Sequence, residues 1–393
     1  MRVKAVLTCT FLLIFVTGAS ASTYKTLLSF YEEGETPYAG LTFDRAGNLY
    51  GTAAYGLYTE GSIFQLTPSG SGWQVNVLYQ FDFYNQEGAD PVGGLVVDEA
   101  GNIYGTTSHD FNPEAGCGSV FKLAPTGSSW TLTYLRYFSY PGAEGCEPEA
   151  TLSYSNGRLW GTTKSGGSKG YGTVFSMDTS GGSFQSESFP AKWKGREPLS
   201  ALTKYGIGTT YSGGNKGQGN IYSLDPNKGL INKRSFQAKG KAGYAPMGDL
   251  LAMDGGFIFG TTSAGGAGDG GTVFQFREYP LYSGQWHFSI LHSFTRGSSE
   301  GWAPMGGLTA DAAGNLYGTT QGGGPTESGC GTVFKLSPNS PKWTYSVFYG
   351  FDYWNLDGCL PTGRVVLDAS GNLYGTTLRG GDYDGGTVYE IDP

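Results

Sequence analysis

Short apolar stretches alternate with turn-forming stretches along the whole chain, and no segment keeps a 3.6-residue apolar period. Four kinds of stretch recur in a fixed order. They are an apolar one such as 94–98, an Asn-Leu-Tyr-Gly-Thr-Thr one such as 372–377, a Gly-Thr-Val-Phe-Lys-Leu one such as 331–336, and one with alternating aromatic and aliphatic residues such as 343–351. Alternation of this kind is typical of strands with two differently packed faces. We therefore predict an all-β chain built from four-stranded units.

The four-stranded unit is repeated through the chain. Its second stretch is anchored at Gly51, Gly105, Gly161, Gly208, Gly260, Gly318 and Gly375. These anchors lie about 47 to 58 residues apart, a period typical of propellers and solenoids. An Asp-x-x-Gly-Asn turn joins the first and second stretches of the clearest copies, and the copy around Gly208 has lost it. Four antiparallel strands make one propeller blade, so we predict a seven-bladed β-propeller of four-stranded antiparallel blades. A β-helix is the alternative.

The two ends of the chain complement each other. Residues 24–30 form an isolated stretch of the fourth kind, and the chain stops at Pro393 just after a stretch of the third kind. We therefore expect the N-terminal strand to complete the last blade by pairing beside 387–391 and to close the ring. A β-helix would not need this complementation.

The N-terminus is typical of a secretory signal peptide. A basic start at 1–4 precedes an apolar run at 5–17 and a small-residue cleavage site at 19–21. We predict a signal peptide over 1–21, cleaved near Ala21, and a single propeller domain over 22–393. No other segment approaches the roughly 20 apolar residues of a membrane span. We expect a secreted protein, extracellular or periplasmic, without a transmembrane segment, and a monomer.

Composition narrows the class of partner. Glycine contributes 67 residues and aromatic residues 15%, while only 15% are charged, which suits many short strands and turns. The formal net charge is −8. Nucleic acids and anionic membranes are held mainly by basic patches, so we predict neither as a partner.

Four cysteines follow the predicted signal peptide and form two equivalent pairs. Cys117 and Cys146 are separated by the same interval as Cys330 and Cys359. The first of each pair precedes a Gly-[Ser/Thr]-Val-Phe stretch, and the second lies in an acidic-Gly-Cys-x-Pro loop. In an exported chain this arrangement predicts the disulfides Cys117–Cys146 and Cys330–Cys359. No CxxC spacing or clustered histidine favours a metal or redox role.

Acidic residues recur at two places in the unit. One set precedes Gly-x-x-Pro and comprises Glu33, Glu87, Glu144, Glu300 and Asp357. The other begins the Asp-x-x-Gly-Asn turns and comprises Asp44, Asp98, Asp311 and Asp368. Either set could bind a cation, and the first could supply paired carboxylates for glycoside hydrolysis. A residue repeated in every blade usually serves the blade, so we expect bonds to backbone amides of the same turn and predict no metal and no cofactor.

Positions at which the repeats disagree are better candidates for binding, because blade geometry does not dictate them. Those just after Gly-Thr-Thr include His109, Lys164, Tyr211, Gln321 and Arg379. Those after the acidic-Gly, or its equivalent, include Arg196, Tyr244 and Trp302. In a propeller both sets lie on one face. Aromatic rings beside polar donors and acceptors suit carbohydrate, since sugar C–H faces stack on rings while hydroxyls form hydrogen bonds.

The pattern Gly-Asn-Leu-Tyr-Gly-Thr-Thr, then Gly-Gly, then Gly-Thr-Val-Phe-x-Leu resembles the GloVer tandem repeat of exported bacterial proteins. The resemblance covers nearly all of the chain after residue 21, and the copies around Gly318 and Gly375 are close to the consensus. It implies export and a propeller-like fold, and it carries no established activity. Members of that family carry varied surface anchors, whereas this sequence shows none before Pro393, so we expect release from the cell.

These observations favour a secreted, non-catalytic binding or interaction propeller with polysaccharide as the ligand class. An extracellular carbohydrate-active enzyme, a glycosidase or lyase using loop carboxylates, is the first alternative, and a scaffold for extracellular proteins is the second. Convergence of two carboxylates across the central opening would favour the enzyme. A flat loop face would favour the scaffold. The chain has no HExxH motif to support a zinc protease.

Overall fold

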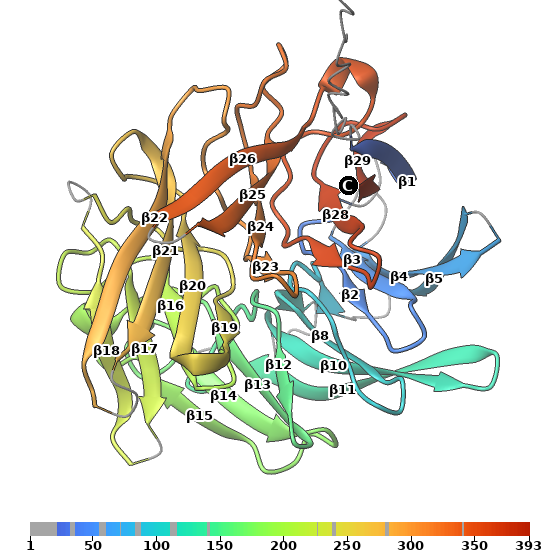
Figure 1. Cartoon of the computed structure of the whole chain (residues 1–393). Coiled ribbons are helices and arrows are strands. Elements are labelled where there is room, and N and C mark those ends of the chain that lie inside the picture. The colour runs from blue at the N-terminus through green and yellow to red at the C-terminus, as the bar shows by residue number, and fades with distance from the viewer. Residues whose placement is uncertain are drawn as a thin grey trace, which may run out of the picture.

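The computed structural model describes most of the chain as a ring of β-sheets (Figure 1). The described residues are 22–31, 36–54, 60–70, 72–82, 88–110, 116–139, 142–225, 227–237, 241–279, 283–339 and 342–393. The predicted signal peptide and the acids Glu33 and Glu87 lie outside them. Seven antiparallel sheets surround a common centre, which confirms the seven-bladed β-propeller. No helix among the described residues is long and apolar enough to cross a bilayer.

The first four blades follow one another along the chain. Blade 1 contains β2 (Thr42–Phe43), β3 (Leu49–Ala53), β4 (Ser62–Ser69) and β5 (Gly72–Gln80). Blade 2 contains β7 (Val96–Val97), β8 (Ile103–Thr107), β10 (Gly116–Thr126) and β11 (Ser129–Ser139). Blade 3 contains β12 (Ser153–Ser155), β13 (Arg158–Thr163), β14 (Thr173–Asp178) and β15 (Gln185–Ser188). Blade 4 contains β16 (Ile207–Thr210), β17 (Asn220–Asp225) and β18 (Gly229–Ser235).

The last three blades continue the ring. Blade 5 contains β19 (Leu251–Met253), β20 (Phe257–Thr262), β21 (Asp269–Glu278) and β22 (Trp286–Thr295). Blade 6 contains β23 (Thr309–Ala310), β24 (Leu316–Thr320), β25 (Thr332–Asn339) and β26 (Lys342–Gly350). Blade 7 contains β27 (Val366–Leu367), β28 (Leu373–Thr377), β29 (Asp384–Asp392) and β1 (Thr23–Tyr31). Short elements outside the blades are the pair β6 (Gly88–Ala89) and β9 (His109–Asp110), and the 3₁₀ turns Lys192–Lys194, Asp254–Gly256 and Tyr353–Asn355.

The N-terminal strand closes the ring as predicted. Strand β1 pairs antiparallel with β29 along its length, from Thr23 opposite Asp392 to Tyr31 opposite Asp384, and Figure 1 shows β1 beside β29 near the C-terminus. The Tyr24 ring stacks on Tyr349 at 4.9 Å between centroids. Blade 7 therefore combines strands from both ends of the sequence and has four strands.

Hydrophobic packing occurs between blades rather than in one central core. The described residues form seven buried apolar clusters, and each cluster joins two neighbouring blades. At the seam, Phe30 and Val388 of blade 7 pack with Leu41 and Phe64 of blade 1. Radial repetition thus gives every sheet two partners, and the seam between the chain ends is packed like the other junctions.

The Gly of each Tyr-Gly-Thr unit is required by the aromatic residue that faces it on the next strand. Gly105 lies opposite Phe121 in the ladder, and a Cβ added to Gly105 would be 2.5 Å from the Phe121 ring. At Gly375 the corresponding contact is 2.3 Å from the Tyr389 hydroxyl. The ring covers the glycine backbone, which explains why the two motifs recur together.

The threonine after that glycine fastens one blade to the next. Thr52 Oγ1 donates to the Gly93 carbonyl at 3.1 Å, and Thr376 Oγ1 donates to the Ala39 carbonyl at 2.8 Å across the seam. Equivalent bonds are made by Thr162, Thr261 and Thr319. Thr209 and Thr106 are the exceptions. Thr209 Oγ1 donates to the Ser200 hydroxyl of its own blade, and the buried Thr106 hydroxyl has no partner among the described residues.

Blade 4 departs from the four-stranded pattern, as the loss of its turn motif suggests. Its sheet has three assigned strands. Thr203 takes the place of the turn aspartate, and its hydroxyl accepts a hydrogen bond from the Ile207 amide at 3.1 Å. A threonine hydroxyl offers one oxygen where a carboxylate offers two, so the turn is held by fewer bonds.

Candidate functional site

Two kinds of loop meet on one face of the ring. The Pro loop contains Gly-x-x-Pro and leads into the first strand of a blade, and the Gly loop joins its second and third strands. The two loops of a blade are bridged at Thr36–Ala54, Ala89–His109, Cys146–Ser165, Arg196–Ser212, Tyr244–Ala264, Trp302–Gly322 and Cys359–Arg379. All seven blades therefore present both loops on the same side, which we call the loop face.

The residue before the proline links adjacent blades in six of the seven Pro loops. The Glu147 amide donates to the Cys117 carbonyl of blade 2 at 2.9 Å, and its carbonyl accepts from the Lys164 amide of blade 3 at 2.9 Å. Six such residues have φ between 55° and 60°, namely Asp90, Glu147, Glu197, Ala245, Ala303 and Leu360. This conformation costs a non-glycine residue on the order of 1 kcal/mol, and here the two hydrogen bonds offset it.

Both predicted disulfides are present and cross blade junctions at the same place. Cys117 in the Gly loop of blade 2 is bonded to Cys146 in the Pro loop of blade 3. Cys330 of blade 6 is bonded in the same way to Cys359 of blade 7. They reinforce the hydrogen bonds that hold the loop face together.

The recurrent acids before Gly-x-x-Pro bond to the segment that precedes them rather than to their own turn. Glu300 Oε1 accepts from the Thr295 amide at 3.0 Å, and Asp357 Oδ1 accepts from the Asp352 amide at 2.8 Å. Glu144 pairs with an arginine of β11. The expectation of amides in the same turn is therefore wrong for Glu300 and Asp357, since the donors lie five residues upstream.

The turn aspartates are occupied by their own turns. Asp98 Oδ1 accepts from the amides of Ala100 and Asn102, each at 2.9 Å. Its Oδ2 accepts from Asn102 Nδ2 at 2.8 Å and from the Tyr104 hydroxyl at 3.0 Å. Asp44, Asp311 and Asp368 repeat this arrangement. Both carboxylate oxygens thus serve the blade.

Two predicted binding residues belong to a charged cluster beside the centre of the loop face. His109 Nδ1 lies 3.2 Å from Asp90 Oδ2, and this hydrogen bond raises the pKa of the His109 imidazole. Lys164 Nζ lies 2.8 Å from Glu149 Oε1. Glu149 also lines the central pocket, so Lys164 is connected to that pocket through an ion pair.

The two predicted arginines are paired within their own loops. Arg196 lies 2.6 Å from Glu197, the residue next to it. Arg379 lies 3.5 Å from Asp384. Their guanidinium groups are exposed at the rim of the loop face and have carboxylate partners there.

The remaining predicted residues are spread around the rim. Tyr211 is 37% exposed. Tyr244 and Trp302 each pack on a glycine of the Gly loop in their own blade. The guanidinium of Arg296 lies 5.4 Å from the centroid of the Trp302 ring. The backbone amide of Gln321 donates to the carbonyl of Ala303, the residue before Pro304. Of the eight predicted binding residues, only Lys164 contacts a residue of the central pocket.

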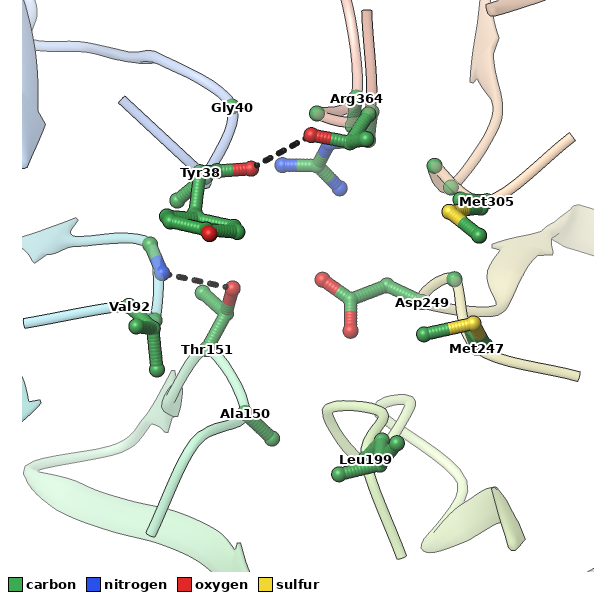
Figure 2. Close-up of a pocket in the computed structure, with 18 of the residues that line it drawn as sticks. Tyr38, Gly40, Val92, Ala150, Thr151, Leu199, Met247, Asp249, Met305 and Arg364 are labelled. Atoms are coloured by element: carbon green, nitrogen blue, oxygen red, sulfur yellow. Dashed lines mark hydrogen bonds between the residues drawn. The ribbon is translucent and has the colours of Figure 1, made fainter. Parts of the chain in front are cut away.

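The pocket lies where the Pro loops enter the first strands, at the centre of the ring (Figure 2). Its volume is about 600 Å³, including space open to solvent. The residue after each proline lines it, which gives Tyr38, Val92, Glu149, Leu199, Met247, Met305 and Thr362. The third residue after the proline adds Gly40, Gly94, Thr151, Asp249, Gly307 and Arg364. All seven blades therefore surround this pocket.

Two oppositely charged side chains face the pocket without pairing. Figure 2 shows the Asp249 carboxylate and the Arg364 guanidinium directed into its open centre from different blades. Asp249 Oδ1 accepts from the Ala201 amide at 2.6 Å. Burial raises the pKa of the Asp249 carboxyl, while the Arg364 charge and hydrogen bonds from Ala201 and Thr151 oppose that rise. The site thus holds an acceptor and a multiple donor with space between them.

The sequence distinguishes Asp249 and Arg364 from the other repeats, although neither residue is among the eight predicted binding residues. Aligning the repeats on their prolines puts small residues or threonine at the third following position in five blades, and Asp249 and Arg364 in the other two. The Pro loop leads directly to the ring axis, so this position faces the centre, whereas residues after Gly-Thr-Thr lie farther out.

Solved structures with similar chain folds are distant. A candidate 6-phosphogluconolactonase from Bacteroides uniformis is 15% identical, with a TM-score of 0.46 over 86% of this chain and 88% of that one. A protein from Lactobacillus plantarum is 15% identical, with a TM-score of 0.48 over 79% and 83%. A protein of unknown function from Dyadobacter fermentans is 11% identical, with a TM-score of 0.47 over 94% and 98%. None is similar enough to transfer an activity to this chain.

Comparison with functionally curated proteins gives no match. The sequence profile of the Gloeobacter/Verrucomicrobia repeat matches residues 13–207, 113–279 and 205–393, which together cover nearly the whole chain. This match confirms the resemblance inferred from the Gly-Asn-Leu-Tyr-Gly-Thr-Thr and Gly-Thr-Val-Phe motifs. The chain therefore belongs to the Gloeobacter/Verrucomicrobia repeat family.

Proposed function

We propose that this protein is a secreted, non-catalytic binding propeller whose loop face takes polysaccharide. The observation that carries the proposal is the central pocket, where Asp249 and Arg364 break an otherwise repeated ring of small residues. Residues that recur in all blades serve the blades, so a departure at the axis is the strongest indication of function. Sugar hydroxyls both donate and accept hydrogen bonds, and this pair offers both counterparts.

The lining around the charged pair also suits a sugar. Tyr38 is 39% exposed and places an aromatic ring at the mouth of the pocket. Met247 and Met305 add apolar surface beside Asp249. Apolar lining with a few convergent polar groups is typical of small-molecule sites. Trp302, Tyr211 and Tyr244 at the rim would contact sugar units outside the pocket.

Export is part of the proposal. A signal peptide over 1–21 would direct the chain out of the cytoplasm, with cleavage near Ala21. The two disulfides fit an extracellular or periplasmic location, because such bonds persist mainly in oxidising compartments.

The test is incubation of the purified protein, lacking residues 1–21, with a panel of plant, fungal and bacterial polysaccharides. Depletion of protein from solution and release of reducing ends are scored in the same tubes. We expect depletion without new ends, and weaker depletion for Asp249→Asn. Tyr205→Ala is the matched control, since Tyr205 is 46% exposed at the end of β16 away from the loop face. Absence of depletion with every glycan would refute the proposal.

A carbohydrate-active enzyme is the second candidate, and one observation favours it. The pocket holds two carboxyl groups, Asp249 and Glu149, and burial raises the pKa of Asp249 in the direction that a general acid needs. Glu149, however, is paired with Lys164. New sugar ends that disappear with Asp249→Asn would establish the enzyme in place of the binding module. A hollow at the ring centre does not favour the alternative of a flat protein scaffold.

A further inference from the structure

Arg364 differs from every other arginine that the structure describes. The others contact a carboxylate, a hydroxyl or an aromatic ring, as at Arg45, Arg136, Arg158, Arg196, Arg234, Arg277, Arg296 and Arg379. The Arg364 guanidinium makes no hydrogen bond or ion pair with any described residue, and it is directed into the central pocket. Five N–H donors are therefore available to whatever occupies that pocket.

The backbone on either side of Arg364 is held against blade 1. A Cβ added to Gly40 would be 2.4 Å from the Arg364 carbonyl oxygen, and one added to Gly363 would be 2.7 Å from the Gly40 nitrogen. Thr362 Oγ1 also donates to the Tyr38 carbonyl at 3.2 Å. This close packing fixes where the arginine leaves the chain, so only the torsions of its side chain need to be ordered when a ligand binds.

The charges around the pocket select the kind of anion. Glu149 already has Lys164 as its partner at 2.8 Å. Asp249 has a hydrogen bond from the Ala201 amide, and its second oxygen faces the same space as Arg364. The pocket therefore holds one cation, Arg364, that has no ion-pair partner among the described residues, with the Asp249 carboxyl across the same space. A doubly charged phosphate would meet more repulsion from Asp249 and Glu149 than a carboxylate would.

The shape of the pocket selects the part of the ligand that enters. Lining residues come from all seven blades, so the ring encloses the pocket on every side. A chain end or a single side unit can enter such a pocket from the loop face and reach Asp249 and Arg364 near the ring axis. Met247 and Met305 supply apolar surface for the C–H groups of that unit.

We infer that the central pocket binds a terminal uronic acid of a polysaccharide, with the sugar carboxylate on Arg364 and sugar hydroxyls on Asp249. The inference rests on the proposed function and names its ligand class. Arg364 presents a planar set of N–H donors that matches both oxygens of a carboxylate. Asp249 accepts hydrogen bonds from neighbouring hydroxyls and orients the ring.

The experiment uses two ligands that differ only in charge. Galacturonate oligomers and their fully methyl-esterified forms are titrated into the protein lacking residues 1–21 by calorimetry at low salt. We expect the free acid to bind about 10- to 100-fold more tightly than the ester, as for a hydrogen bond to a charged group. Arg364→Gln should abolish that preference, so that the acid and the ester bind this variant with similar affinity. Arg364→Lys should keep part of it.

The control is Arg379→Gln, which removes a loop-face arginine that is paired with Asp384 and lies outside the pocket lining. It should retain the full preference for the acid. Thermal midpoints of the variants establish that each is folded. If Arg364→Gln does not fold, Arg364→Lys serves as the test variant.

The outcomes separate the inference from the proposed function. Equal binding of acid and ester by the unaltered protein overturns the uronate inference and leaves glycan binding intact. Failure to bind any glycan overturns both. Inorganic phosphate that displaces the oligomers more effectively than galacturonate does would also overturn the inference, because the recognised anion would then be phosphoryl.

Discussion

The threonine bonds between blades provide a matched pair of substitutions. Thr376 and Thr106 occupy the same position in blades 7 and 2, and each is 2% exposed. Thr376 Oγ1 donates to the Ala39 carbonyl at 2.8 Å across the seam where the chain ends meet. The Thr106 hydroxyl has no partner among the described residues. Valine keeps the shape of threonine and removes only the hydroxyl, so Thr376→Val and Thr106→Val test the bond itself.

The expected effects have opposite signs. Thr376→Val leaves a buried carbonyl without its partner, which costs about 1 to 3 kcal/mol. Thr106→Val removes a hydroxyl that is buried without a bond, so it should leave the free energy of unfolding unchanged or raise it by up to about 1 kcal/mol. The difference between the two variants should therefore be on the order of 2 kcal/mol.

Urea unfolding with the disulfides intact is the suitable assay. A chain of this size gains so much entropy on unfolding that 1 kcal/mol shifts the thermal midpoint by only about 1 to 2 °C. The urea midpoint and its slope separate a change in stability from a change in the exposed surface. If Thr106→Val destabilises the protein as much as Thr376→Val, the hydroxyl is not the source of the effect, and the account of the seam is refuted.

Four further predictions concern the blades. Tyr222→Phe should raise the free energy of unfolding by about 1 kcal/mol in urea titrations, because the Tyr222 hydroxyl is buried with no described partner. Replacing both cysteines of either disulfide with alanine should lower the free energy of unfolding by about 3 to 4 kcal/mol. The loss should be equal for the two disulfides, because both close loops with a sequence separation of 29. Burial opposes ionisation of Asp311, but hydrogen bonds from Asn315 and Tyr317 lower its pKa. The contribution of the Asp311 carboxylate to the free energy of unfolding is therefore full above about pH 4 and is lost as pH falls through the folded-state pKa. Asp311→Asn should therefore flatten the fall in the thermal midpoint between about pH 6 and pH 3. Deletion of β1 should lower the thermal midpoint, and an unchanged midpoint would show that this strand does not hold the ring closed.

Much of the fold follows from residues close together in the sequence. The Asp98 turn is held by donors two to six residues away, and the Gly105–Phe121 contact joins neighbouring strands. Such local units can be recognised in each repeat and counted. Closure by β1 could also be predicted, because a lone alternating strand at one end complements a blade lacking its fourth strand at the other.

The candidate site was harder to predict, for a physical reason. Asp249 and Arg364 belong to different blades, and only the radial arrangement of the ring brings them to one pocket. Recurrent acids such as Glu300 are obvious candidates in the sequence, yet their carboxylate oxygens accept hydrogen bonds from nearby backbone amides. Distance from the ring axis decides which variable positions face the pocket, and a repeat pattern indicates strand order without giving that distance.

The left-handed residue before each proline gives the loop face a polarity. In blades 2 to 4 this residue is Asp90, Glu147 or Glu197, and in blades 5 to 7 it is Ala245, Ala303 or Leu360. The backbone role is the same throughout, so the side chains are free to differ. Asp90, Glu147 and Glu197 each lie beside a cationic side chain, namely His109, Lys164 and Arg196, whereas the alanines and the leucine carry no charge. The loop face of a ring of near-identical units is therefore not symmetric, because ion pairs hold the loops of blades 2 to 4 where backbone hydrogen bonds alone act at the same place in blades 5 to 7.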